Sequence, residues 1–188
     1  MEPILRDIPY SFESERLTIR GPLPGDGERL RTAVMESQAA LKPWMPWAVS
    51  IPSKEEYETI VRKGQIRYLA REDLWMMLLL KGTDTIIGGS GLHRIKWSVA
   101  RMEIGYWVHT AHQGKGFITE AVKAITQFAF STCKASRVEI RCDEKNVRSA
   151  AVARRAGFSY EGTMIAEDRH HLTNELRNTM MFAISRPD

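Results

Sequence analysis

The chain has 188 residues, of which 43% are hydrophobic, a length and composition that suit one domain spanning residues 1–188. Its 27 basic and 23 acidic residues give a net charge of +4 without the dense basic run typical of nucleic-acid-binding proteins. The longest apolar run, Leu74–Leu80, is far shorter than the roughly 20 residues of a membrane span. The N-terminus has no apolar core of signal-peptide length, and two cysteines that match no zinc spacing imply neither a disulfide framework nor a metal site. We therefore expect a soluble, cytoplasmic protein without direct nucleic-acid or membrane partners.

The first third of the chain predicts one strand and two helices. Residues 15–20 alternate polar and apolar, as in a half-buried strand. Asp26 follows a loop rich in glycine and proline and is expected to cap a helix that runs to about residue 38. Two prolines exclude a regular helix over 41–47, and a capping box over 53–56 opens a second helix that runs toward residue 70.

The remainder reads as strands interrupted by two helices. Strands are expected over 74–81, from 85, over 100–109, over 135–142, over 158–167 and over 174–185. Apolar residues recur at helical spacing from Phe117 to about Thr132, and a short helix over 146–156 stops at Gly157. The resulting order, β-α-α-β-β-β-α-β-α-β-β, predicts an α/β (α+β) fold in which helices cover the faces of a mixed sheet.

The most informative segment is the turn between the strand ending near His109 and the helix beginning at Phe117. Gly114 and Gly116 flank Lys115 there, and glycine has no Cβ to keep a ligand away from the backbone. The first amides of the helix lack intrahelical acceptors and carry the positive end of its dipole, so they can bind a pyrophosphate. The segment matches neither a P-loop nor the dinucleotide fingerprint, since Gly116 follows Lys115 and Thr119 stands where a third glycine is needed. A simple tight turn is the alternative.

This segment resembles the acyl-CoA motif of the GNAT superfamily, Gln/Arg-x-x-Gly-x-Gly/Ala before a helix. The glycine pair matches, while Ala111 stands at the first position, which one branch of the family often leaves without Gln or Arg. Five further stretches are similar to that branch, which resembles ribosomal-protein-alanine N-acetyltransferases: Leu41–Trp47, Glu103–Val108, Thr119–Ala121, Asn146–Ser149 and Arg155–Phe158. The resemblance covers about residues 15–185.

The resemblance implies a mostly antiparallel seven-stranded sheet flanked by about four helices. Strands four and five, here about 100–109 and 136–142, would splay into a V-shaped cleft for acetyl-CoA. It implies that pantetheine bonds the backbone near Trp107 and Val108, and that the diphosphate sits on the amides of Gln113 through Phe117. Lys115 could add charge or point to solvent. No metal is implied.

The implied reaction is direct attack of an amine on the acetyl thioester. It needs a proton acceptor for the ammonium and a proton donor for the leaving thiolate, and the sequence offers no covalent nucleophile set. Ser149 is the candidate for protonating the thiolate or hydrogen-bonding the sulfur, with Asn146 bonding pantetheine or holding Ser149. Equally, Asn146 could be a simple N-cap with Ser149 in the first helical turn. Glu103 is the candidate base or a structural ion-pair partner, and Glu167 and Asp168 are rival bases.

The favoured acceptor is a protein N-terminal α-amino group. Such a group has a pKa of about 7.7–8.0, so on the order of 10% is neutral at pH 7 and only weak base assistance is needed. Trp44 and Trp47 could wall the acceptor pocket or simply pack as hydrophobic residues. Two alternatives stay open: transfer to a small amine, amino acid or antibiotic, and a non-catalytic acyl-CoA sensor. The resemblance also makes a homodimer plausible.

Overall fold

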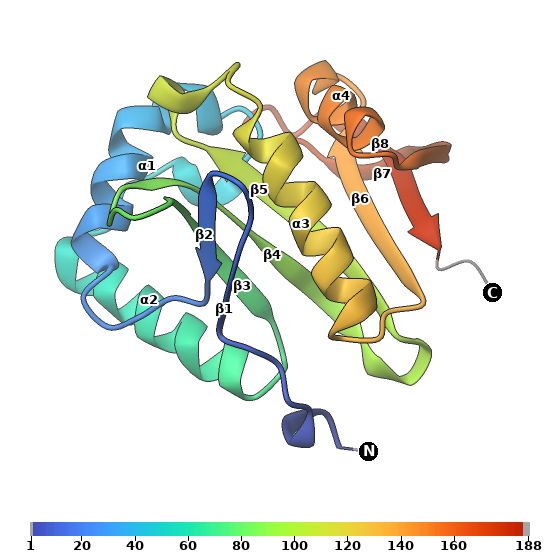
Figure 1. Ribbon diagram of the computed structural model, residues 1–188. Coiled ribbons are helices and arrows are strands. Elements are labelled where there is room, and N and C mark those ends of the chain that lie inside the picture. Colours follow the sequence, from blue (N-terminus) through green and yellow to red (C-terminus); the bar gives the residue numbers. More distant parts are fainter. Residues whose placement is uncertain (1, 186–188) are drawn as a thin grey trace.

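The computed structural model describes residues 2–185 as one eight-stranded sheet in the order β1-β2-β3-β4-β5-β6-β8-β7 (Figure 1). Met1 and residues 186–188, which the predicted domain includes, lie outside that description. The strands are β1 (Ser11–Glu13), β2 (Leu17–Arg20), β3 (Leu74–Leu80), β4 (Ile86–Lys96), β5 (Arg101–Val108), β6 (Arg137–Asp143), β7 (Ser159–Arg169) and β8 (Leu176–Ser185). The α-helices are α1 (Gly27–Leu41), α2 (Lys54–Leu69), α3 (Phe117–Ser131) and α4 (Val147–Arg155), and 3-10 turns occupy Pro3–Leu5, Pro46–Ala48, Trp97–Val99 and Thr110–His112.

The predicted α/β architecture, with four α-helices in the described range and a mixed, mostly antiparallel sheet, is confirmed. The sheet has one strand more than the seven expected. The additional strand, β1, has three residues and pairs antiparallel with β2. Three residues are too few to show the alternation that identifies a strand in sequence.

Both faces of the sheet are covered, which explains the continuous apolar sequence of β3. Leu74, Met76 and Leu78 face a core that includes α3 and α4, whereas Met77 and Leu79 face a second core formed with α1 and α2. Alternate side chains of a strand point to opposite faces, so a central strand covered twice is apolar at every position. In Figure 1, α3 crosses one face of the sheet, and α1 and α2 lie against the other.

The two N-terminal helices start differently. The capping box of α2 is present, because Ser53 Oγ accepts from the Glu56 amide at 3.2 Å and the Glu56 carboxylate accepts from the Ser53 amide at 2.7 Å. Asp26 stands at the N-cap of α1, but its side chain makes no capping bond.

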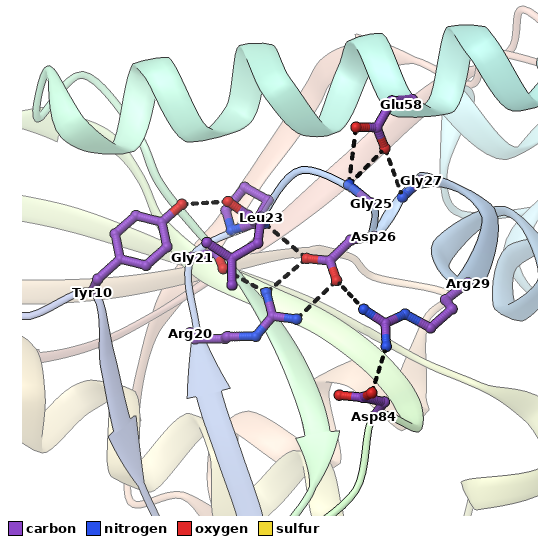
Figure 2. Close-up of polar contacts among 11 residues, drawn as sticks. Tyr10, Arg20, Gly21, Leu23, Gly25, Asp26, Gly27, Arg29, Glu58 and Asp84 are labelled. Carbon is purple, nitrogen blue, oxygen red and sulfur yellow. Dashed lines mark hydrogen bonds and ion pairs between the residues drawn. The ribbon is translucent and has the colours of Figure 1, made fainter.

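The Asp26 carboxylate is instead the centre of a buried polar network (Figure 2). It accepts from the two terminal guanidinium nitrogens of Arg20, Nη1 and Nη2, at 2.7 and 2.8 Å, and it also accepts from Arg29 and the Leu23 amide. The Glu58 carboxylate of α2 accepts from the amides of Gly25 and Gly27 at the start of α1. The expected local cap is therefore corrected: a carboxylate from another helix serves these amides, because the buried Asp26 is engaged by two arginines.

The central feature for function is the separation of β5 from β6. These strands are the only parallel neighbours in the described sheet, and they pair only from Arg101 to Glu103 against Arg137 to Glu139. Beyond Glu103, β5 continues to pair with β4 on its other side as far as Val108. The second half of β5 therefore has one unpaired edge, as the predicted splay requires.

Candidate active site

A cleft of about 1120 Å³ opens beside the end of β5, beyond the residues that pair with β6. Its walls come from the end of β5, the turn before α3, the first residues of α3, one side of α4 and the segment 39–45 that ends α1 and follows it. The unpaired edge of β5 offers backbone donors and acceptors along one wall, as an open sheet edge does. An extended, polar ligand can therefore add to this edge like a short strand.

The turn at one end of this cleft has the backbone of an anion site. Gly114 and Gly116 have φ of +73° and +82°, a left-handed conformation that residues with a Cβ avoid. Gly116 is the N-cap of α3, and the amides of Phe117, Ile118 and Thr119 have no acceptor within the helix. Phosphate oxygens placed there would receive those hydrogen bonds and the positive end of the helix dipole.

Arg16, at the start of β2, braces the turn from outside. It forms an ion pair with Glu120 at 2.7 Å, donates to the Lys115 carbonyl at 3.1 Å and stacks on the Phe117 ring at 4.3 Å. The Lys115 ammonium folds back onto the Ala111 carbonyl at 2.8 Å. Lys115 does not line the cleft, so its side chain serves the turn and its backbone amide is what it can offer a ligand.

Two arginines on α4 face the turn from the opposite wall. Arg148 reaches Gln113 Oε1 at 3.5 Å, and Arg155 reaches Thr119 Oγ1 at the same distance. Both line the cleft with Val152 between them. Residues seven apart lie on one helix face, so their spacing is a signal that sequence analysis could have used.

A second, smaller cleft of about 310 Å³ adjoins the first. The two share Trp44, Met45, Tyr106, Asn146 and Ser149. The smaller cleft is charged: its lining includes the carboxylates of Glu103, Asp143, Glu167 and Asp168 and the guanidinium groups of Arg94, Arg141 and Arg177.

The residues at the junction are joined by hydrogen bonds. Tyr106, on β5, places its hydroxyl 3.0 Å from Ser149 Oγ and 2.9 Å from the Ser149 carbonyl oxygen. Asn146 is the N-cap of α4, where its Oδ1 accepts from the Ser149 amide at 3.1 Å. Asn146 thus performs the capping role, and it also lines both clefts.

The three predicted base candidates all line the smaller cleft, in different electrostatic settings. Glu167 is bound by Arg141 and by Thr179 Oγ1 at 3.0 Å. Asp168 pairs with Arg177 at 3.0 Å, and hydrogen bonds from the Arg169 amide and Arg177 lower the pKa of Asp168.

Glu103 differs from both rivals. Its side chain is 17% exposed and its ion-pair partner, Arg94, lies at 3.4 Å. Burial raises the pKa of Glu103 above its ordinary value, and Arg94 and Arg141 offset that only in part. Burial therefore favours the protonated form of Glu103, whereas the hydrogen bonds of Asp168 favour its ionised form.

Comparison with known proteins identifies the family that has this architecture. A family model described as an acetyltransferase (GNAT) domain matches residues 16–159, which is most of the chain. The chain belongs to the GNAT acetyltransferase family. It is accordingly an acetyl-CoA-dependent N-acetyltransferase.

Some of the curated relatives of this acetyltransferase have names that refer to the ribosome or its proteins. "Putative ribosomal N-acetyltransferase YdaF" of Bacillus subtilis (strain 168) is 33% identical over 79% of this chain and 81% of its own length. The ribosomal-protein-serine acetyltransferase of Escherichia coli (strain K12) is 28% identical over 80% of this chain and 83% of its own. A solved ribosomal L7/L12 α-N-protein acetyltransferase in complex with coenzyme A shares the fold, with a TM-score of 0.84 at 23% identity over 95% of this chain and 97% of that one.

The cosubstrate fits the residues of the large cleft. All the predicted acetyl-CoA-binding residues except Lys115 line it: Trp107, Val108, Gln113, Gly114, Gly116, Phe117 and Asn146. The cleft volume, the free amides of the turn and the cations Arg148 and Arg155 suit a long ligand that ends in phosphates. Within residues 2–185 no group of His, Cys, Asp and Glu side chains could hold a metal, and no helix has the length and apolar character to cross a membrane.

Of the two tryptophans that are candidates for the acceptor site, one lines the clefts and the other does not. Trp44 lines both clefts. Trp47 is absent from both linings; it is 46% exposed and packs edge-on against Trp107 with ring centroids 6.0 Å apart. This contact is the packing that was weighed for Trp47, and a role in the acceptor site stays a prediction. Tyr106 and Met45 are site-lining residues that sequence analysis missed, since neither carries a local signal of its own.

Proposed function

We propose that this acetyltransferase transfers the acetyl group of acetyl-CoA to the α-amino group of a protein N-terminus. One observation carries the proposal: a large cleft with a phosphate-binding turn meets a small carboxylate-lined cleft at Tyr106, Asn146 and Ser149. A thioester held from the first cleft and an amine entering from the second would meet at this junction. Holding both reactants in place supplies much of the rate enhancement of such a transfer.

Glu103 is assigned the role of proton acceptor, directly or through one water. Its raised pKa makes it a better base than an ordinary carboxylate. An α-amino group at a pKa of about 7.7–8.0 is neutral to on the order of 10% at pH 7, whereas a lysine at about 10.4 is neutral only to a few parts in ten thousand. A carboxylate of modest basicity therefore suffices for an N-terminus and would serve a lysine poorly.

Ser149 is assigned the role of hydrogen-bond donor that stabilises the sulfur as it leaves at the end of acetyl transfer. Its hydroxyl lines both clefts, and its position is set by the Asn146 cap and by Tyr106. Asn146 keeps the first turn of α4 in place and thereby fixes where the Ser149 hydroxyl can point.

The protein N-terminus is supported by the relatives, whose names refer to ribosomal proteins. A specific observation favours a second candidate, a small amine. The smaller cleft, at about 310 Å³, lies at the low end of the range of about 300–1000 Å³ for small-molecule sites. A peptide would place only its first residues in this cleft.

The test is an acceptor panel with acetyl-CoA and the purified chain. Matched peptides carry a free N-terminus with no lysine, or a blocked N-terminus with one internal lysine, and small amines and amino acids complete the panel. Release of coenzyme A and the product masses are measured. We expect acetylation of free N-termini and little of the internal lysine.

The other results have defined meanings. Acetylation confined to small amines supports the second candidate and overturns the protein acceptor. Preference for internal lysine contradicts the assignment to α-amino groups. Tight binding of acetyl-CoA without turnover on any member would overturn both proposed acceptors and return the acyl-CoA sensor to consideration.

A further inference from the structure

The hydroxyl of Tyr106 contacts two oxygen atoms of one residue. It donates to the Ser149 carbonyl oxygen at 2.9 Å and lies 3.0 Å from Ser149 Oγ, a contact in which either oxygen can be the donor. Tyr106 lines both clefts, at the point where they meet. No local motif predicts its contact with Ser149, since 43 residues separate the two.

A phenol has one proton, and this restricts what Ser149 can do. While Tyr106 donates to the carbonyl oxygen, the short contact with Ser149 Oγ requires the serine proton to point at Tyr106. When Tyr106 turns its proton toward Ser149 Oγ, the serine hydroxyl becomes an acceptor from Tyr106 and its own proton is free to point into the cleft. The direction of one phenolic proton therefore decides whether Ser149 can donate to a ligand.

The Tyr106 phenol keeps its proton near neutral pH. Burial raises the pKa of Tyr106 well above its ordinary value, and the hydrogen bond with Ser149 offsets this only in part. The buried Cys142 thiol is also next to Ser149, and burial raises its pKa as well. Both neighbours of the serine hydroxyl thus stay protonated near neutral pH, and neither becomes a negative charge that would compete for the serine proton.

We propose that Tyr106 is a positioning residue that turns the Ser149 hydroxyl toward the coenzyme A sulfur by donating its own proton to Ser149 Oγ. In this state the serine hydroxyl donates a hydrogen bond to the leaving sulfur and stabilises the thiolate that forms as the carbon–sulfur bond breaks; the serine keeps its own proton, and the thiolate takes a proton from solvent. The Tyr106 proton strengthens its bond to the serine oxygen and stays on the phenol. The inference rests on the proposed role of Ser149 in acetyl transfer.

The first test needs no turnover. The ionisation of the coenzyme A thiol, bound to the protein, is followed by the ultraviolet absorbance of the thiolate as pH is raised. A hydroxyl that donates to sulfur stabilises the thiolate and lowers the pKa of the thiol. We expect Tyr106→Phe and Ser149→Ala each to raise that pKa by about one pH unit, the worth of about one hydrogen bond. The double variant should rise no further than Ser149→Ala alone.

The second test uses turnover on the best acceptor. Tyr106→Phe should lower kcat about tenfold and change the KM for acetyl-CoA by no more than about twofold. When Tyr106→Phe is added to the Ser149→Ala variant, kcat should fall little further. Tyr68→Phe is the matched control. Tyr68 is fully buried and donates to the Pro9 carbonyl at 2.7 Å, and it lines neither cleft. Its variant should lose stability while keeping kcat and the thiol pKa.

The outcomes separate the two ideas. The positioning role is overturned if Tyr106→Phe lowers kcat by the same factor in the parent protein and in the Ser149→Ala variant. It is also overturned if Tyr106→Phe leaves the thiol pKa unchanged. The role of Ser149 fails if Ser149→Ala leaves both kcat and the thiol pKa unchanged, and the inference about Tyr106 fails with it. Turnover in the parent protein, together with a thiol pKa that rises in both single variants, supports the role of Ser149 and the positioning role of Tyr106.

Discussion

Glu103 on β5 lies opposite Glu139 on β6 at the last position where these parallel strands pair. Glu139 is bound by Arg137 at 2.7 Å and lies 3.8 Å from Arg101, whereas Glu103 has Arg94 at 3.4 Å. Two carboxylates at one register position thus differ in charge compensation. The less compensated one, Glu103, lines the smaller cleft.

Glu103→Gln should lower kcat/KM for an α-amine acceptor by about ten- to a hundred-fold, because it removes the proton acceptor. Burial raises the pKa of Glu103, so the carboxylate is lost as pH falls through that raised value. The ratio of parent to variant rates should therefore approach one at acid pH and be greatest above the pKa. Glu167→Gln and Asp168→Asn are the comparisons, and a larger loss in either would reassign the base.

The glycine turn predicts a loss of cosubstrate affinity on substitution. Gly116→Ala should weaken acetyl-CoA binding at least tenfold in calorimetry, because a left-handed alanine costs about 1–2 kcal/mol and a relaxed turn re-aims the α3 amides. A Cβ on residue 116 would lie 3.5 Å from Arg16 Nη2, so there is room for the methyl group. Gly82→Ala is the control, since Gly82 has a φ of +75° and open space but joins β3 to β4. Equal loss of affinity in both variants would contradict the site.

The buried network of Figure 2 predicts acid sensitivity. Burial works to raise the pKa of Asp26, but hydrogen bonds from Arg20, the Leu23 amide and Arg29 outweigh it, so that pKa is lowered. A lowered pKa stabilises the fold above the unfolded-state value of about 3.9, and the stabilisation is lost as pH falls through the folded value. Asp26→Asn should cost about 3–5 kcal/mol in denaturant unfolding at pH 7, since it leaves Arg20 without its charge partner. This loss should shrink at the lowest pH at which the parent still folds, and a pH-independent loss would contradict the account.

Substitution of Trp44 and of Trp47 should have different effects. Trp44→Ala should raise the acceptor KM several-fold, because Trp44 lines the junction of both clefts. Trp47→Ala removes edge-on packing against Trp107 and should act mainly on the melting temperature. Steady-state kinetics and thermal unfolding of the two variants distinguish these effects, and a larger KM change from Trp47→Ala would return that residue to the acceptor site.

Local features were predictable because their chemistry lies within a few residues. The capping box of Ser53 and Glu56 closes within one helical turn, and the positive φ of Gly114 and Gly116 reflects what a tight turn before a helix demands. The Asn146 cap of Ser149 has the same short range. The expected cap at Asp26 was wrong because its competitors, Arg20 and Arg29, are charged and come within 2.8 Å in the folded chain.

By itself, the sequence determined the order of all the helices and strands except β1, the glycine turn and the caps of α2 and α4, since hydrophobic period and backbone conformation are local properties. Only the tertiary structure decided which residues meet at the junction. Tyr106 reaches Ser149, and Glu103 ends with weaker charge compensation than Glu139, because β5 and β6 pair for a few residues and then separate. Such contacts depend on strand order and on where the pairing stops, and neither is encoded within any short stretch of the chain.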